Sequence, residues 1–170
     1  MKMKEPMPIR KQNRLPNYNY ASNGTYFVTI CTADRKNLFW ERNQPFVVGE
    51  DIILPPEEIR LSAYGKIVRQ AILQIPTHYE NFELLQYVIM PNHIHLILHI
   101  VNGSGQMISA PTISTIIGQL KRYITKKIGK PIWQKSFHDH IIRNKEDFDM
   151  IAKYIYENPT RWQYDRYFNT

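Results

Sequence analysis

The sequence predicts an α+β sandwich in which helices pack on a mostly antiparallel sheet. Two observations support this prediction. Runs of β-branched and aromatic residues, typical of strands, alternate along the chain with runs whose apolar residues recur at helical spacing. Two of the strand-like runs are separated only by Pro91 and Asn92, turn-forming residues that indicate a hairpin.

The first expected strand covers residues 25–32, with the sequence TYFVTICT. It is short and mostly apolar, which favours a central place in the sheet. A short edge strand is expected at residues 52–54, because Pro55 and Pro56 end that run.

The first expected helix covers residues 62–75, where apolar side chains recur every three or four residues until Pro76 stops the run. Strands at residues 82–90 and 93–100 follow and form the hairpin. The second expected helix carries an apolar stripe over residues 113–128, and Gly129 ends it.

A strand at residues 137–143 precedes Asn144, a good helix N-cap, and a third helix is expected from there to about Asn158, before Pro159. The order of strands and helices is that of a ferredoxin-like or RRM-like sandwich with one further helix.

The length of 170 residues suits one domain with a substantial core. Residues 1–23 look like a basic N-terminal arm, and residues 24–170 are expected to form a single catalytic domain. No apolar run approaches the roughly 20 residues of a membrane helix, so no membrane partner is expected. The N-terminus does not resemble a secretory signal, which indicates a cytoplasmic protein, associated with the nucleoid when it binds DNA.

Charge and cysteine content restrict the classes of partner and site. The formal net charge of +7 and the isoelectric point near 9.5 favour a polyanionic partner, with nucleic acid as the first candidate. Cys31 is the single cysteine, which excludes an intrachain disulfide and a zinc site built on paired cysteines. A metal ion would therefore use His, Asp, Glu or Asn.

His93 and His95 are the first candidate site residues. Residues two apart in a strand point to the same face, so the two imidazoles would be directed at one point. An isolated His-x-His pair is ambiguous, because such histidines can also be partly buried structural residues.

Tyr154 and Asn158 are the second pair of candidates. They are four residues apart in the third expected helix and so lie on one of its faces. Phe148, Ile151 and Ile155 form the adjacent apolar face, which can dock while Tyr154 and Asn158 stay at its margin.

Several segments resemble the single-tyrosine HUH transposases, and most closely the REP-associated tyrosine transposases. They are VIMPNHIHLIL (88–98), WQKSFHDHIIRN (133–144) and YIYENPTRW (154–162). The segment YNYASNGTYFVTICTADR (18–35) is similar to that group's start, so the resemblance extends over essentially the whole chain in the same order.

The resemblance implies that His93, His95 and Asn158 bind a divalent ion, Mg²⁺ or Mn²⁺, and that Tyr154 is the nucleophile. It implies a DNA transposase that nicks and transfers strands of single-stranded or hairpin DNA, such as repeat elements, through a 5′-phosphotyrosine link. Imidazole and amide ligands suit such an ion, which would polarise the scissile phosphate.

Other residues offer alternatives within the sequence. Tyr123 is a second candidate nucleophile, but Lys127 stands where a metal ligand would be needed. His138 and His140 form a second His-x-His pair, for which a structural or DNA-contacting role is favoured. His99 continues the face of His93 and His95 but is too far along the strand to be a ligand.

Contacts with DNA are expected from basic residues and from exposed aromatic rings. The aromatic candidates are Trp40, Trp133, Trp162 and Tyr164. The basic candidates are Arg10, Lys11, Arg14, Lys121, Arg122, Lys126, Lys127 and Arg143.

Two functions remain as alternatives, a nucleic-acid-binding protein without catalysis and a nuclease that uses metal-activated water. A homodimer is compatible with the sequence.

Overall fold

The computed structural model describes residues 23–42, 59–101 and 111–168. Its centre is a four-stranded antiparallel sheet with the strand order β2-β3-β1-β4. The predicted α+β class, a mostly antiparallel sheet with helices packed on it, is therefore confirmed, as is the central position of the first strand. The strands are β1 (Gly24–Cys31), β2 (Phe82–Ile89), β3 (His93–Ile100) and β4 (His138–Ile142).

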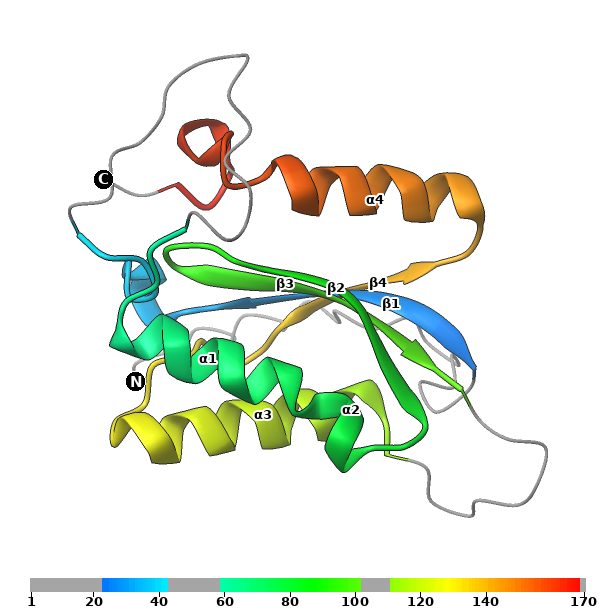
Figure 1. Ribbon diagram of the computed structural model, residues 1–170, viewed down its shortest axis with the longest axis horizontal. Helices are drawn as coiled ribbons and strands as arrows, with labels where there is room; N and C mark the ends of the chain where they lie inside the picture. Colours follow the sequence, from blue (N-terminus) through cyan, green and yellow to red (C-terminus); the bar gives the residue numbers. More distant parts are fainter. Residues whose placement is uncertain (1–22, 43–58, 102–110, 169–170) are drawn as a thin grey trace, which may run out of the picture.

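Helices cover both faces of this sheet (Figure 1). The helices α1 (Ala63–Leu73), α2 (Ile75–His78) and α3 (Ile113–Ile128) lie on one face. The helix α4 (Lys145–Glu157) crosses the other face, where the Gln86 side-chain amide donates to the Ala152 carbonyl at 3.1 Å.

The first helical segment differs from the prediction at Pro76. The sequence predicted one helix over residues 62–75 that Pro76 stops, whereas α1 ends at Leu73 and the separate single turn α2 contains Pro76 in its first positions. Proline is tolerated there because the first N–H groups of a helix have no intrahelical acceptor. Pro76 therefore begins a helical turn instead of marking the end of one.

Predicted helix ends are confirmed by cap geometry. Gly129 ends α3 with a φ of 81°, the left-handed conformation that glycine adopts without strain. The Asn144 side chain accepts from Asp147 N at 2.8 Å and begins α4. The last strand is one residue shorter at each end than the expected run of 137–143.

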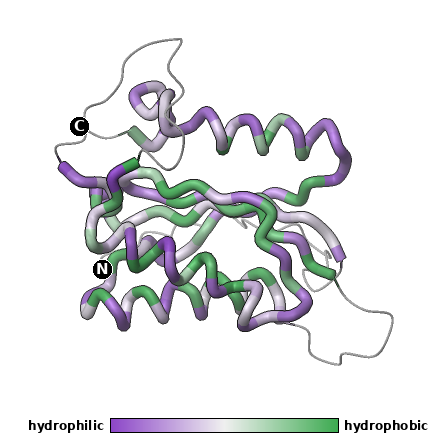
Figure 2. Tube along the Cα trace, in the orientation of Figure 1, coloured by the Kyte–Doolittle hydropathy of each residue, from purple (hydrophilic) through white to green (hydrophobic). Residues whose placement is uncertain are grey.

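The central strand β3 is buried on both faces apart from the half-buried His99, since helices lie above and below it. Figure 2 shows hydrophobic residues concentrated along the strands and alternating with hydrophilic residues along the helices. None of the helices in the described ranges is long and apolar enough to cross a membrane. The expected edge strand at residues 52–54 and the basic arm, apart from Asn23, lie outside the described residues.

Candidate metal and nucleophile site

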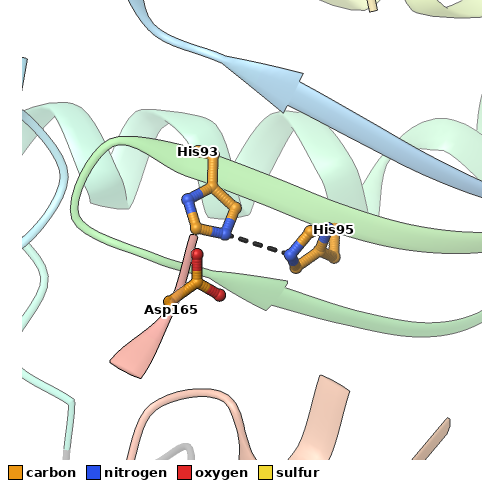
Figure 3. A group of neighbouring side chains, drawn as sticks. All are labelled: His93, His95 and Asp165. Atoms are coloured by element: carbon orange, nitrogen blue, oxygen red, sulfur yellow. Dashed lines mark hydrogen bonds between the residues drawn. The ribbon is translucent and has the colours of Figure 1, made fainter. Parts of the chain in front are cut away.

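His93 and His95 lie at the start of β3, on the face of the sheet that α4 covers. Both side chains are fully buried, and their Nε2 atoms are 3.0 Å apart (Figure 3). The convergence predicted from the alternation of a strand is therefore present in the structure.

Hydrogen bonds fix the orientation of both imidazoles. His95 Nδ1 lies 2.8 Å from the hydroxyl of Thr29, which is its direct cross-strand partner on β1. His93 Nδ1 lies 2.9 Å from Asn92 Oδ1. The Asn92 amide nitrogen donates to the carbonyls of Arg35 and Tyr167, so Oδ1 is its acceptor and His93 Nδ1 is the donor. The Nε2 lone pair of His93 is thus directed toward the site.

Both histidines are held neutral. Burial, followed by the charges of Arg166 and Arg35, lowers the pKa of His93 to about 3. Burial and the neighbouring His93 also lower the pKa of His95 well below its ordinary value. Neutral imidazole is the form that binds a metal ion.

The helix α4 brings Tyr154 and Asn158 to the histidine pair. The Tyr154 hydroxyl is 3.3 Å from His95 Nε2, and it donates to Asp165 Oδ2 at 3.1 Å. Asn158 also donates to Asp165 Oδ2, at 3.0 Å, while its own Oδ1 is buried and accepts no hydrogen bond from the described residues. The four residues predicted for the site thus lie together.

Asp165 is a candidate site residue that the sequence prediction missed. One of its carboxylate oxygens and one ring nitrogen each of His93 and His95 lie within 4.8 Å of one another. It follows the short turn Trp162–Tyr164 in a segment without helical or strand periodicity. No pattern distinguishes this carboxylate from the other acidic residues of the chain, so only the fold identifies it.

Tyr154 is protonated in this environment. Burial, followed by the nearby Asp165 carboxylate, raises the pKa of its phenol to about 12. The phenol would therefore have to transfer its proton to a neighbouring group before or during an attack, and Asp165 already accepts its hydrogen bond.

The alternative residues lie elsewhere. Tyr123 is on α3, which lies on the opposite face of the sheet from α4 (Figure 1), and Lys127 lies over its ring. His138 is exposed, and His140 pairs with Asp147 at 2.9 Å, which fits the structural role favoured above. His99 bonds to the Thr25 hydroxyl at 2.9 Å.

The predicted DNA-binding residues differ in their exposure and in the hydrogen bonds that they form within the protein. Arg122, Lys126, Lys127 and Arg143 are exposed. The ammonium of Lys121, in contrast, donates to the carbonyls of residues 134–136 and so holds the chain between α3 and β4. Arg10, Lys11 and Arg14 lie outside the described residues.

The four aromatic candidates for DNA contact separate by burial. Trp40 and Trp162 belong to the buried core, and Trp133 is half-buried. Tyr164 is 83% exposed and directly precedes Asp165, so it alone of the four has a ring freely available beside the site.

Comparison with known proteins gives relatives along most of the chain, although no protein-family model matches. An uncharacterised protein of Haemophilus influenzae is 29% identical over 92% of both chains. A REP-associated tyrosine transposase of Escherichia coli is 26% identical over 84% of this chain and 70% of its own length. The chain is similar to REP-associated tyrosine transposases. The resemblance predicted from the sequence motifs is therefore confirmed.

A solved structure agrees at the level of the fold. The structure of a REP-associated tyrosine transposase bound to a REP hairpin superimposes with a TM-score of 0.59 at 23% identity, over 90% of this chain and 76% of that one. The α+β architecture of the two proteins is thus the same.

Proposed function

We propose that this protein is a transposase-like enzyme that cuts and rejoins DNA strands with Tyr154 as the nucleophile. The observation that carries the proposal is the convergence of a phenol, two buried and neutral imidazoles and a carboxylate at one point. Similarity to a REP-associated tyrosine transposase supports the transposase function and a DNA partner. The structure of such an enzyme with a REP hairpin favours single-stranded or hairpin DNA as the substrate.

The donor set fits a divalent metal ion, Mg²⁺ or Mn²⁺. His93 and His95 offer Nε2 atoms, Asp165 offers a carboxylate oxygen, and Asn158 offers the buried Oδ1 atom for which the described residues provide no donor. Nitrogen and oxygen ligands in this combination suit such an ion. When bound, the ion would polarise a phosphodiester and stabilise charge on its oxygens.

The residues of the chain account for the remaining chemistry. The Tyr154 oxygen forms a bond to phosphorus while the bond from phosphorus to the 3′ oxygen breaks, and Asp165 is placed to take the phenolic proton. The products are a 5′-phosphotyrosine and a strand end that takes a proton from solvent to become a 3′-hydroxyl. Because the phosphodiester is retained as a link to tyrosine, the 3′-hydroxyl of another strand can reverse the step and join to it.

A denaturing gel with 3′-end-labelled hairpin DNA and Mn²⁺ tests this proposal. We expect a covalent protein–DNA band for the wild type and none for Tyr154→Phe. Tyr123→Phe is the matched control, because Tyr123 and Tyr154 are both 39% exposed and both lie on helices. A band that persists in Tyr154→Phe would refute the assignment. Cleavage of the DNA without a covalent band in any variant would favour a nuclease that uses activated water. Binding of the DNA without cleavage would favour a non-catalytic protein.

A further inference from the structure

Two arginine side chains that the chemistry above does not use lie beside the site. Tyr154 packs on His95, with ring centres 5.3 Å apart, whereas Tyr167 packs on His93, at 4.6 Å. The guanidinium carbon of Arg166 lies 4.6 Å from the centre of the Tyr167 ring, and that of Arg35 lies 5.4 Å from it. Each guanidinium is therefore one aromatic ring away from His93.

The backbone that carries these arginines is anchored to the site itself. The amide nitrogen of Asn92 donates to the carbonyls of Arg35 and Tyr167, while Asn92 Oδ1 orients His93. Arg35 also has a φ of 52°, an unusual value for a residue other than glycine, and it donates a hydrogen bond to the Arg166 carbonyl at 3.4 Å. One buried asparagine thus fixes both the candidate ligand and the two basic segments.

The two guanidinium groups are available to an anion. Both residues are exposed, and neither forms an ion pair with a carboxylate within the described parts of the chain. Arg166 donates a hydrogen bond to the neutral Tyr167 hydroxyl at 2.6 Å, the one polar side-chain partner that the described residues give it. Guanidinium groups bind phosphate oxygens through paired N–H donors, and a site beside a nucleophile needs such donors to place the phosphate.

We infer that Arg35 and Arg166 bind phosphate oxygens of the DNA strand next to His93, and so hold the strand for attack by Tyr154 from the other side of the histidine pair. This inference rests on the proposed function, because it assumes that the reacting phosphodiester lies at the histidine cluster. It adds a phosphate-binding surface, formed by Arg35 and Arg166, that includes no basic residue of α3.

The salt dependence of DNA binding tests the inference. For fluorescein-labelled oligothymidylate, each phosphate contact contributes roughly 0.7 to the slope of log K against log salt. The double variant Arg35→Gln/Arg166→Gln should therefore reduce the magnitude of this negative slope by about 1.4. It should also slow formation of the covalent band at saturating hairpin DNA by at least about tenfold, the cost expected when a positioning contact is lost.

Two further variants make the result specific. Lys66→Gln/Arg69→Gln removes the same charge from exposed positions of α1, across the sheet, and should change neither slope nor rate. Arg35→Lys/Arg166→Lys keeps the charge and should retain the slope while the rate falls, because an ammonium lacks the paired donors.

The inference is wrong if the glutamine variant matches the wild type in slope and rate, or if the α1 variant loses as much as the glutamine variant. A changed slope with no covalent band in the wild type would refute the tyrosine chemistry and still support phosphate binding.

Discussion

The partner of each Nδ1 atom decides what the facing Nε2 atom of that histidine can do. In His93, Nδ1 donates to Asn92, which leaves the Nε2 lone pair for the site. In His95, Nδ1 faces the Thr29 hydroxyl, which can donate or accept. When Thr29 donates, His95 Nε2 carries the proton and can share it with His93 Nε2. When Thr29 accepts, both Nε2 atoms are free for one cation.

Thr29→Val should weaken Mn²⁺ binding by roughly 10- to 100-fold, the usual cost of losing a hydrogen-bond partner of a metal-binding histidine. Valine has the same shape and suits a strand, so the fold should be retained. Calorimetric titration with Mn²⁺ measures the change.

Thr25→Val is the matched control for that change, since Thr25 lies on the same strand and bonds to His99 in the same way, away from the site. Equal losses in the two variants would mean that the effect comes from β1 and not from the orientation of His95.

The sequence predicted His93, His95, Tyr154 and Asn158 because each pair has a spacing that one strand or one helix turns into proximity. Asp165 and Arg35 have no such spacing. Asp165 reaches the site because the chain turns back after α4, and Arg35 because β1 ends beside β3. Those contacts are tertiary, and no local pattern encodes them.

At the level of elements, the contacts at the start of α4 determine where Tyr154 lies. Asp147 accepts from His140 on β4 and from the backbone N–H of Arg143. The hydrogen bond from His140, followed by the Arg143 N–H, lowers the pKa of the Asp147 carboxyl. A lowered pKa in the folded state contributes stability at pH values above the unfolded value of 3.8, and this contribution is lost as the pH falls through the folded value.

Asp147→Asn should therefore lower the free energy of unfolding by about 0.5–1 kcal/mol at pH 7, in line with a partly exposed pair at a helix N-terminus. The difference should shrink below pH 3.8. Urea unfolding at several pH values measures it. Asp149→Asn, which removes only an exposed pair with Lys145, should change stability by a few tenths of a kcal/mol at most. A loss at Asp147 that is independent of pH would contradict the account.

The helix α1 crosses the chain so closely at Gly65 that a side chain there would meet the Phe39 carbonyl. Gly65→Ala should lower the free energy of unfolding by about 1–3 kcal/mol, the usual cost of overpacking. Gly118→Ala on α3 meets open space and should instead stabilise the helix by roughly 0.5–1 kcal/mol. Thermal unfolding of both variants measures the two changes in stability. A stabilising Gly65→Ala would show that the contact between Gly65 and the Phe39 carbonyl is not tight.

Element boundaries were predictable where one residue type has one structural use. Gly129 and Asn144 mark helix ends through their conformation and their side-chain acceptor. Pro76 was misleading because proline both ends a helix and fits the first turn of another. The choice between these uses depends on where the chain must turn toward β2, which is a property of the whole fold.

For the whole molecule, the proposed function gives the two faces of the sheet different roles. One face packs α1, α2 and α3 on the apolar core, and the other carries α4, the histidine pair and the Asp165 segment. The exposed basic residues of α3 are thus separated from Tyr154, the proposed nucleophile, by the sheet. They can add to the affinity for DNA, but they cannot position the reacting phosphate.

The proposed function requires that Tyr154 become covalently joined to DNA. Mass spectrometry of the wild-type protein after reaction with hairpin DNA and Mn²⁺, followed by nuclease and protease digestion, tests it most directly. We expect a nucleotide phosphate on the peptide that contains Tyr154. A nucleotide on Tyr123 or another residue, or cut DNA with an unmodified Tyr154 peptide throughout the reaction, would contradict it.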